Sequence, residues 1–224
     1  MLAKIRLMVT RLSVFVQERR LGINSEAEVS LQHYGVTDKE CHHYGPMNYI
    51  RFWQLMRRIK IRPRKDVFLD LGSGMGRVVV LAATYPFRKV IGVELVEELN
   101  AIGRENVRKA MPRLKCREIE LHNVDARNYR IPAEVTVIFL LNSFGGDVLS
   151  RVFSNIRESI MKSPRTVTIL YLTPPEPSTC LERIKDELPW LPEPRRLNFA
   201  GKLQADVFTC DGAVAEGVTA GTDI

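Results

Sequence analysis

The segment Asp70-Leu71-Gly72-Ser73-Gly74-Met75-Gly76 combines a carboxylate with a glycine-rich turn. A strand-like apolar run, Val67-Phe68-Leu69, precedes it, and a helix-like run begins at Arg77. Because glycine has no Cβ and adopts positive φ at little cost, such a turn brings bare backbone close to a ligand. The start of the following helix adds unpaired N–H groups and the positive end of the helix dipole. This segment is therefore the strongest candidate for a ligand-binding loop.

The glycine spacing and two acidic residues restrict the ligand. Dinucleotide-binding loops of hydride-transfer enzymes have the pattern G-x-G-x-x-G, whereas here the pattern is G-x-G-x-G and Arg77 stands where their third glycine would be. Asp70 would repel a pyrophosphate and attract a cationic amino group. Glu94, at the end of the next strand-like run, could accept both hydroxyls of a ribose. S-adenosylmethionine carries an ammonium at one end and a ribose at the other, so it suits both carboxylates.

Residues 66–94 resemble the cofactor-binding half of class I S-adenosylmethionine-dependent methyltransferases. The resemblance is closest to small prokaryotic methyltransferases of undefined substrate. It is more distant to the non-SET histone-lysine methyltransferases, which share the style of the first motif, Asp-Val-Phe-x-Asp-Leu-Gly-Ser-Gly-x-Gly, and a Val-Ile-Phe fourth strand. An ordinary glycine turn would explain the loop but not both acidic residues. The residues expected to bind the cofactor are Asp70, Gly72, Ser73, Gly74, Gly76, Glu94, Leu95, Asp125, Ala126 and Asn142.

Asp125 follows the third predicted strand. The resemblance implies that an acidic residue at this place accepts the adenine amino group, and that the backbone N–H of Ala126 faces the ring. The alternative is that Asp125 only caps a short helix over residues 126–129, a position that aspartate favours.

The run Asn142-Ser143-Phe144-Gly145 follows the fourth predicted strand, where in the resembled family the transferred methyl group meets the acceptor. Many methyltransferases that act on nitrogen carry Asn/Asp-Pro-Pro-Tyr/Phe here, and the closer prokaryotic relatives carry Asn-Pro-Phe-Gly. This chain has Ser143 in place of the proline. Asn142 could hold the acceptor's N–H, or else only satisfy loop backbone. Phe144 could wall the pocket or favour a methylated cation.

The run Tyr44-Gly45-Pro46-Met47 resembles a Tyr-x-Pro-Thr run of the same relatives, which closes over cofactor and substrate, with methionine in place of the threonine. Tyr44 and Tyr49 are therefore candidates to line the acceptor site, or else pack at a helix start. No strong general base is required if the acceptor arrives as a neutral amine, although His42 and His43 could accept a proton. The expected catalytic residues are Asn142, Phe144, Tyr44 and Tyr49.

These residues need a fold that brings the ends of several strands together. Strands are predicted near 66–71, 89–94, 117–122, 135–141 and 166–171, and helices near 48–61, 76–85, 96–111, 145–162 and 178–188. Such alternation indicates a parallel sheet with right-handed crossovers, and a last antiparallel pair is expected near 194–198 and 203–209. The prediction is an α/β, Rossmann-like doubly wound sheet, mostly parallel with an antiparallel last strand and helices on both faces. Ligands bind such sheets beyond the carboxyl ends of the strands.

Three segments are expected: an N-terminal amphipathic helix and linker over 1–43, a methyltransferase domain over 44–210, and a disordered tail over 211–224. In the first segment, one helix face is apolar; it comprises Ile5, Met8, Val9, Leu12, Phe15 and Val16. That face could contact a membrane surface or a partner helix. The favoured alternative is that it packs on its own domain or forms a dimer contact.

Composition bounds the partners and the compartment. The chain of 224 residues has 33 Lys and Arg against 26 Asp and Glu, a net charge of +7. A basic balance favours an acidic partner without establishing one, and the basic segment from Arg51 to Lys65 motivates an RNA alternative. Four scattered cysteines without a C-x-x-C pair disfavour a disulfide framework or a zinc site. We expect a reducing cytoplasm, no secretory signal peptide, no metal and no membrane span.

The sequence therefore predicts an S-adenosylmethionine-dependent methyltransferase. The first hypothesis for its acceptor is a protein lysine, methylated on nitrogen by in-line transfer that depends on positioning. The alternatives are methylation of RNA or of a small molecule, and a non-catalytic cofactor-binding subunit that supports a partner. The acceptor half of the site departs from the nearest patterns, so the sequence does not choose among them.

Overall fold

The described strands form one seven-stranded sheet in the order β3-β2-β1-β4-β5-β7-β6. In the computed structural model, which describes residues 2–173, 180–199 and 203–216, five strands run parallel and β7 runs antiparallel to both of its neighbours. The strands are β1 (Val67–Leu71), β2 (Lys89–Glu94), β3 (Glu118–Asn123), β4 (Val137–Leu141), β5 (Val167–Thr173), β6 (Arg195–Phe199) and β7 (Leu203–Cys210). The predicted fold class is confirmed, including the antiparallel last strand.

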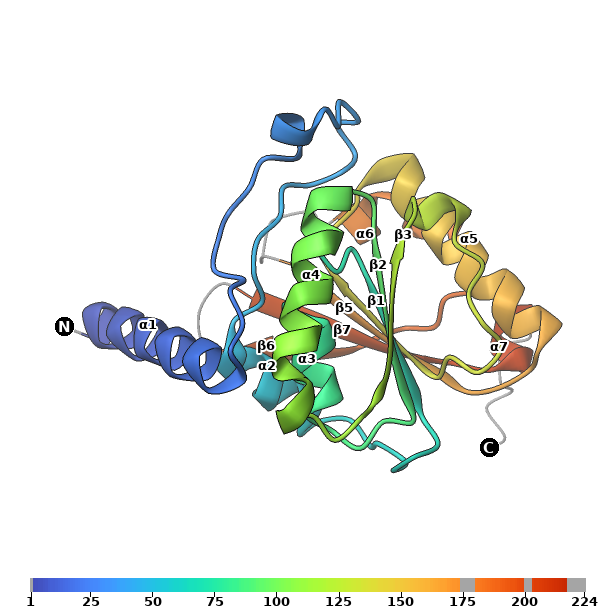
Figure 1. The fold of residues 1–224 in the computed structure, drawn as a ribbon. Coiled ribbons are helices and arrows are strands. Elements are labelled where there is room, and N and C mark those ends of the chain that lie inside the picture. The colour runs from blue at the N-terminus through green and yellow to red at the C-terminus, as the bar shows by residue number, and fades with distance from the viewer. Residues whose placement is uncertain (1, 174–179, 200–202, 217–224) are drawn as a thin grey trace.

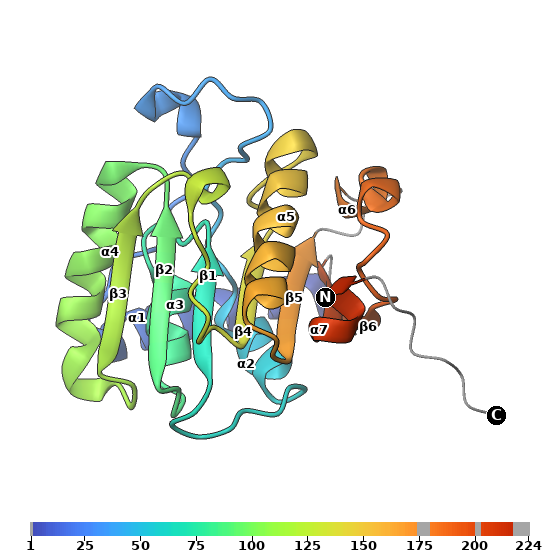
Figure 2. The same cartoon turned by 90° about the vertical axis from the view of Figure 1, so that its right-hand side faces the viewer.

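Helices cover both faces of the sheet, as Figures 1 and 2 show. One face carries α2 (Tyr49–Met56), α3 (Arg77–Ala83) and α4 (Glu97–Ala110), and the other carries α5 (Gly146–Lys162), α6 (Cys180–Arg183) and α7 (Gly212–Glu216). Single 3-10 turns stand at η1 (Leu31–Tyr34), η2 (Met111–Arg113), η3 (Ala126–Asn128) and η4 (Lys185–Glu187). This arrangement buries the central strands on both sides.

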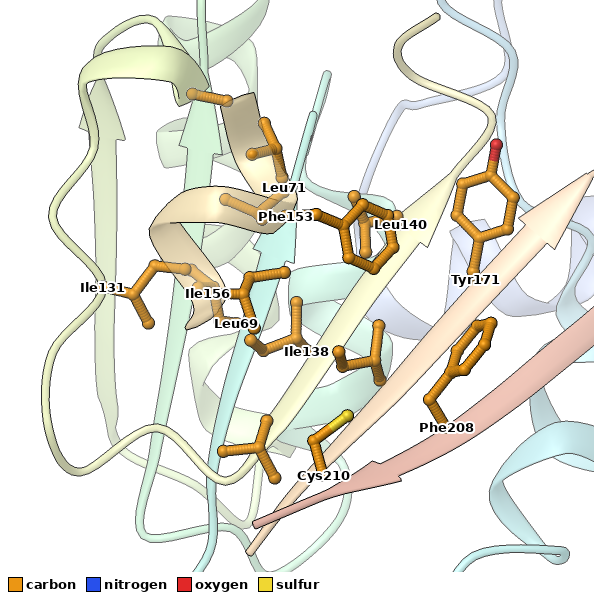
Figure 3. Packing of buried hydrophobic residues seen from close by; sticks show 14 of the residues in the cluster. Leu69, Leu71, Ile131, Ile138, Leu140, Phe153, Ile156, Tyr171, Phe208 and Cys210 are labelled. Carbon is orange, nitrogen blue, oxygen red and sulfur yellow. The ribbon is translucent and has the colours of Figure 1, made fainter. Parts of the chain in front are cut away.

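The central strands alternate between two apolar layers, which is why their sequences are apolar throughout. Phe139 of β4 faces the layer under α2 and α3, whereas its neighbours Ile138 and Leu140 face the layer under α5. Figure 3 shows Phe153 and Ile156 of α5 above that second layer. Because β1 lies between β2 and β4, the chain leaves β1 in one direction and β4 in the other, and a crevice opens between their carboxyl ends.

Three predicted boundaries are wrong. The helix predicted over 178–188 is the short α6 followed by η4, and residues 178–179 lie outside the described residues. The helix predicted over 48–61 begins as expected, with the Asn48 side chain accepting from Arg51 N at 3.1 Å, but it ends at Met56. Beyond it, the Asp66 carboxylate accepts from Arg62 N at 2.6 Å and holds the chain in a loop before β1. The tail predicted to be disordered from residue 211 instead begins with α7, which buries Ala215 under α5. Residues 217–224 of that tail lie outside the described residues.

The first helix, α1 (Leu2–Leu21), lies at the edge of the molecule, and its amino end points away from the sheet (Figure 1). Val14 and Leu21 pack against the core. The side chains of residues 2–7 are outside the described part. The other predicted face residues (Met8, Val9, Leu12, Phe15 and Val16) are exposed, so this face does not pack on its own domain. The dimer contact, which was the other half of the favoured alternative, stays a prediction. No helix among the described residues is long and apolar enough to cross a membrane.

A buried arginine ties α1 and the following segment to the sheet. Arg77, at the start of α3, is 2% exposed, and its guanidinium donates to Glu18 of α1 at 3.0 Å and to Glu26 at 2.5 Å. It also donates to Ser25 Oγ at 2.8 Å and to the Met47 carbonyl at 3.1 Å. One cation thereby satisfies four acceptors from residues 18–47.

We expect Arg77→Leu to lower the free energy of unfolding by about 3 kcal/mol, because it leaves Glu18 and a buried carbonyl without their donor. The urea midpoint at unchanged m-value measures this loss. Arg108→Leu is the matched control, since Arg108 pairs with Glu105 on the exposed face of α4 and exposed pairs contribute little. An equal shift in the two variants would contradict the role given to Arg77.

Candidate functional site

A cleft lies beyond the carboxyl ends of β1, β2 and β4 and is covered by residues 41–47. Most of the predicted site residues line it together. They are Tyr44, Asp70, Gly72, Ser73, Glu94, Leu95, Asp125, Ala126 and Phe144. Gly74, Gly76, Tyr49 and Asn142, which were also predicted for the site, do not line this cleft.

The glycine loop is fastened to the end of β2. Gly72 N and Ser73 N each donate to the Val93 carbonyl at 2.9 Å, and Gly74 N donates to Glu94 Oε2 at 2.7 Å. Gly72 and Gly74 have φ of 82° and 52°, which glycine adopts readily. The loop therefore turns with its first part open to the cleft.

The third glycine of the loop serves helix packing. Gly76 has φ of 76° and precedes α3. A Cβ at Gly76 would lie 3.0 Å from Gly103 Cα of α4, which is too close without movement of that backbone. Gly76 thus allows α3 and α4 to approach each other, and it lies away from the cleft.

Asp70 places a buried acceptor in the cleft. The residue is 3% exposed, and its Oδ2 finds no hydrogen-bond partner among the described residues. Burial first, and then the nearby Glu94 carboxylate, raise the pKa of Asp70 well above its ordinary value. The neighbouring Ser73 Oγ is also buried and without a partner in the described part of the chain. A cationic ligand group here would relieve Asp70, as the predicted cofactor requires.

Glu94 both holds the loop and faces the cleft. Its two oxygens accept from Gly74 N and, at 2.9 Å, from Val96 N. Burial raises the pKa of Glu94, and these backbone N–H groups partly offset that rise. A carboxylate has about four acceptor positions, so Glu94 keeps capacity for ligand hydroxyls. Asp70 and Glu94 together fit the ammonium and the ribose of S-adenosylmethionine.

Asp125 lines the cleft, and its carboxylate is already bound to Arg127. It caps η3 by accepting from Arg127 N at 2.8 Å, and it pairs with the Arg127 guanidinium at 2.6 Å. Burial raises the pKa of Asp125, but the hydrogen bonds from Arg127 outweigh burial and leave that pKa below its ordinary value. Arg127 also pairs with Asp38 at 2.9 Å. The geometry is that of the helix-cap alternative, with Ala126 beside it in the cleft wall.

The loop after β4 divides its residues between two hollows. Ser143 lies over Gly72 and its hydroxyl donates to the Leu71 carbonyl at 3.3 Å, and Phe144 lines the cleft. Asn142 has φ of 43° and lines an adjacent hollow with Thr173 instead. Asn142 therefore does not line the cleft together with the other residues predicted to bind the cofactor.

Residues 40–44 cross over this loop and complete the cleft. Cys41 forms an antiparallel bridge with Phe144, and Gly145 N donates to the Glu40 carbonyl at 2.8 Å. The His42 Nδ1 lies 2.7 Å from the Asn142 carbonyl, which only accepts hydrogen bonds, so Nδ1 carries the proton. In the neutral form of the ring, the lone pair is then on Nε2. His42 lines both hollows. The sequence does not predict that residues 40–44 lie over the loop after β4, because these residues show no hydrophobic periodicity.

The two predicted tyrosines have different places. The Tyr44 ring covers Gly74, where any side chain would overlap with it, and its hydroxyl donates to the Ser25 carbonyl at 3.0 Å. Burial raises the pKa of Tyr44, so its role in the cleft is that of a neutral wall. Tyr49 is fully buried under the Arg77 guanidinium, 4.7 Å from its ring centre. Tyr49 thus packs in the core at the first turn of α2, as in the helix-start alternative, and it does not line the cleft.

Within the described residues, no group of three or more His, Cys, Asp or Glu side chains could hold a metal ion. Among the described residues, no disulfide joins Cys41, Cys116, Cys180 or Cys210.

A family model described as "Histone methylation protein DOT1" matches residues 22–175 of the chain. The H3 lysine-79 specific histone-lysine N-methyltransferase of Caenorhabditis elegans is 28% identical over 148 residues, which cover 61% of this chain and 15% of that protein. The Drosophila melanogaster protein of the same description is 36% identical over 52 residues, which cover 23% of this chain and 3% of that protein. The chain thus spans a small part of the curated relatives that it matches.

Solved structures share the fold. An RNA methyltransferase from Salinibacter ruber in complex with S-adenosyl-L-homocysteine aligns with a TM-score of 0.55 at 21% identity, covering 74% of this chain and 93% of that one. A SAM-dependent methyltransferase from Aquifex aeolicus aligns with a TM-score of 0.55 at 12% identity, covering 70% and 88%. At these identities the likeness establishes the class I methyltransferase fold.

We expect Asp70→Asn to abolish S-adenosylhomocysteine binding and yet to stabilise the ligand-free protein at neutral pH, by about 0.5–2 kcal/mol. Because the folded pKa of Asp70 is raised, its contribution to stability is greatest below the unfolded pKa and is lost as pH rises toward the folded one. The difference in free energy of unfolding between the variant and the wild type should therefore disappear near pH 3.8, which is the ordinary pKa of an aspartate.

Urea unfolding across this pH range, together with thermal shift by the ligand, measures both effects. Asp206→Asn is the control, because that buried carboxylate pairs with Arg196 at 2.8 Å and its loss should destabilise the protein. Retained ligand binding by Asp70→Asn, or destabilisation like that of the control, would contradict the assignment.

Proposed function

The chain belongs to the DOT1 family of histone methylation proteins, a family of S-adenosylmethionine-dependent methyltransferases, and we propose that its acceptor is the side-chain nitrogen of a protein lysine. The observation that carries the lysine acceptor is the family match over residues 22–175. The cofactor half of the proposal rests on the Asp70 carboxylate at the carboxyl end of β1, whose Oδ2 has no hydrogen-bond partner among the described residues.

The cleft binds the cofactor through charge and backbone. Asp70 pairs with the ammonium, and Glu94 accepts from the ribose with the acceptor positions that Gly74 N and Val96 N leave open. Leu95 and Ala126 supply the wall next to them. S-adenosylmethionine supplies a methyl group on a positively charged sulfur, which makes the remaining thioether a good leaving group.

The protein's own contribution is alignment and exclusion of water. Phe144 and Tyr44 are largely apolar walls on two sides of the glycine loop, and the bridge between Cys41 and Phe144 fixes one wall to the segment that carries the other. Holding the acceptor nitrogen in line is worth up to roughly 7–11 kcal/mol of the barrier. An in-line displacement needs little else once the nitrogen is neutral.

A lysine must lose a proton before it can attack, and His42 stands where it can take that proton. Its Nδ1–H is held by the Asn142 carbonyl, so Nε2 is the free acceptor. Cys41, His42 and His43 line both the cleft and the hollow that contains Asn142 and Thr173. We therefore place the entry of the lysine in that hollow, with His42 at the junction.

The RNA alternative rests on the basic segment from Arg51 to Lys65. The second half of that segment lies at the amino ends of the strands, since Arg195 at the start of β6 donates to the Arg58 carbonyl at 2.9 Å. The cleft lies beyond the carboxyl ends of the strands. This separation favours a lysine over RNA as acceptor, because phosphates bound by the second half of the segment would lie away from the cleft.

The acceptor is tested with radiolabelled S-adenosylmethionine in a lysate of the source cells. We expect label in protein, recovered as methylated lysine after hydrolysis, and none with Asp70→Asn. Label that appears only in RNA or in small molecules would overturn the lysine acceptor while leaving the methyltransferase intact. Absence of label everywhere, together with tight cofactor binding, would favour a non-catalytic subunit.

The role of His42 is tested by His42→Asn, because the asparagine amide can still donate to the Asn142 carbonyl but cannot take a proton. We expect kcat to fall about 100-fold at neutral pH, with unchanged affinity for S-adenosylhomocysteine. The deficit should shrink as pH rises, because the lysine then loses its proton to solvent. The exposed His33→Asn serves as control, and a deficit that does not change with pH would show that His42 has only a structural role.

A further inference from the structure

The outer face of α1 is a continuous apolar strip that the protein leaves uncovered. We define it by its exposed residues, which are Met8, Val9, Leu12, Phe15 and Val16. Met8 and Phe15 are 66% and 62% exposed, and spacings of three, four and seven place the set on one side of the helix. An exposed apolar set of this size on one helix indicates a surface that contacts a partner.

This face cannot turn inward to hide itself. Val14 and Leu21, on the opposite side of α1, pack against the core. Glu18 also points inward, to Arg77 at 3.0 Å and to Ser25 Oγ at 2.7 Å. These inward contacts prevent α1 from rotating about its own axis. They therefore keep the outer face exposed.

Positive charge borders the strip, and no exposed acid offsets it on this helix. Arg11, Arg19 and Arg20 are exposed, and the Arg19 guanidinium lies 6.0 Å from the Phe15 ring centre. Glu18 is the one acidic residue of α1 and is committed to Arg77. The outer face thus presents apolar side chains and cations together.

A basic hollow continues this charge beside the carboxyl end of α1. It is lined by Arg20, Arg113 and Lys115, together with Gln17 and Trp53, and Arg113 and Lys115 are exposed. Three cations around a hollow near the carboxyl end of the apolar strip fit anionic head groups that lie above acyl chains.

From these observations we propose that α1 docks on an anionic lipid surface, lying flat with Leu12 and Phe15 inserted and its arginines among the head groups. A convex helix ridge enters a lipid interface without needing a complementary groove, and arginine stems extend along apolar surface while their charged ends stay in water. A second copy of the chain is disfavoured, because two such faces would bring six exposed arginines together in a protein of net charge +7.

The test is flotation of the full-length protein with vesicles of phosphatidylcholine alone or mixed with phosphatidylserine. We expect binding to the mixed vesicles that weakens with salt, and at least about tenfold weaker binding by the double variant Leu12→Ser, Phe15→Ser. Arg11→Gln with Arg19→Gln should remove the preference for the anionic vesicles. Ile102→Ser with Met161→Ser, which alters exposed apolar residues of α4 and α5, is the matched control and should bind as the wild type does.

All these substitutions are at exposed positions, so unchanged thermal unfolding verifies that each variant folds. Equal binding to phosphatidylcholine alone, or equal binding by the Leu12 and Phe15 variant, would overturn the proposal. So would a wild-type dimer in light scattering that does not bind vesicles and that the same double variant converts to a monomer, since the occupant would then be a second copy. Vesicle binding is measured without methyl transfer, so this test does not depend on which acceptor the protein methylates.

Discussion

The guanidinium of Arg77 is the interaction on which the arrangement of this protein depends. It follows the glycine loop directly, and it donates four hydrogen bonds to acceptors from α1, from the segment behind α1 and from the turn before α2. The planar guanidinium reaches these acceptors at once because its donors have a fixed, forked geometry. The segment that covers the loop through Tyr44 is therefore positioned by the residue that begins the next helix.

The cleft combines this rigid support with unfavourable electrostatics at its centre. Asp70 and Glu94 are two buried carboxylates. The Glu94 carboxylate adds to the effect of burial in raising the pKa of Asp70, and only Glu94 is compensated by backbone N–H groups. A buried carboxylate oxygen without a hydrogen-bond partner, as Asp70 has within the described residues, lowers the stability of the folded protein. Local violations of this kind are expected where a ligand supplies the missing partner.

The sequence predicted the sheet well because periodic apolar runs and the glycine loop are local signals. It also predicted Asp70 and Glu94, which stand at strand ends and so share an edge of the sheet. It did not choose between the alternatives for Asn142, which has a left-handed backbone and lines the adjacent hollow. It did not choose between those for Tyr49 either, because the ring packs against Arg77, a residue far along the chain. The crossing by His42 depends on tertiary contacts that no local pattern encodes.

The bridge between Cys41 and Phe144 has a consequence for the order in which the site assembles. His42 contacts Asn142 across 100 positions of the chain, whereas the glycine loop and the end of β2 are near neighbours in sequence. Contacts between distant segments form late, because the loop-closure entropy must be overcome first. During synthesis the covering segment emerges before the strand that receives it. The cofactor half of the cleft can thus take shape early, while the wall that closes it waits for β4 and for the loop that follows.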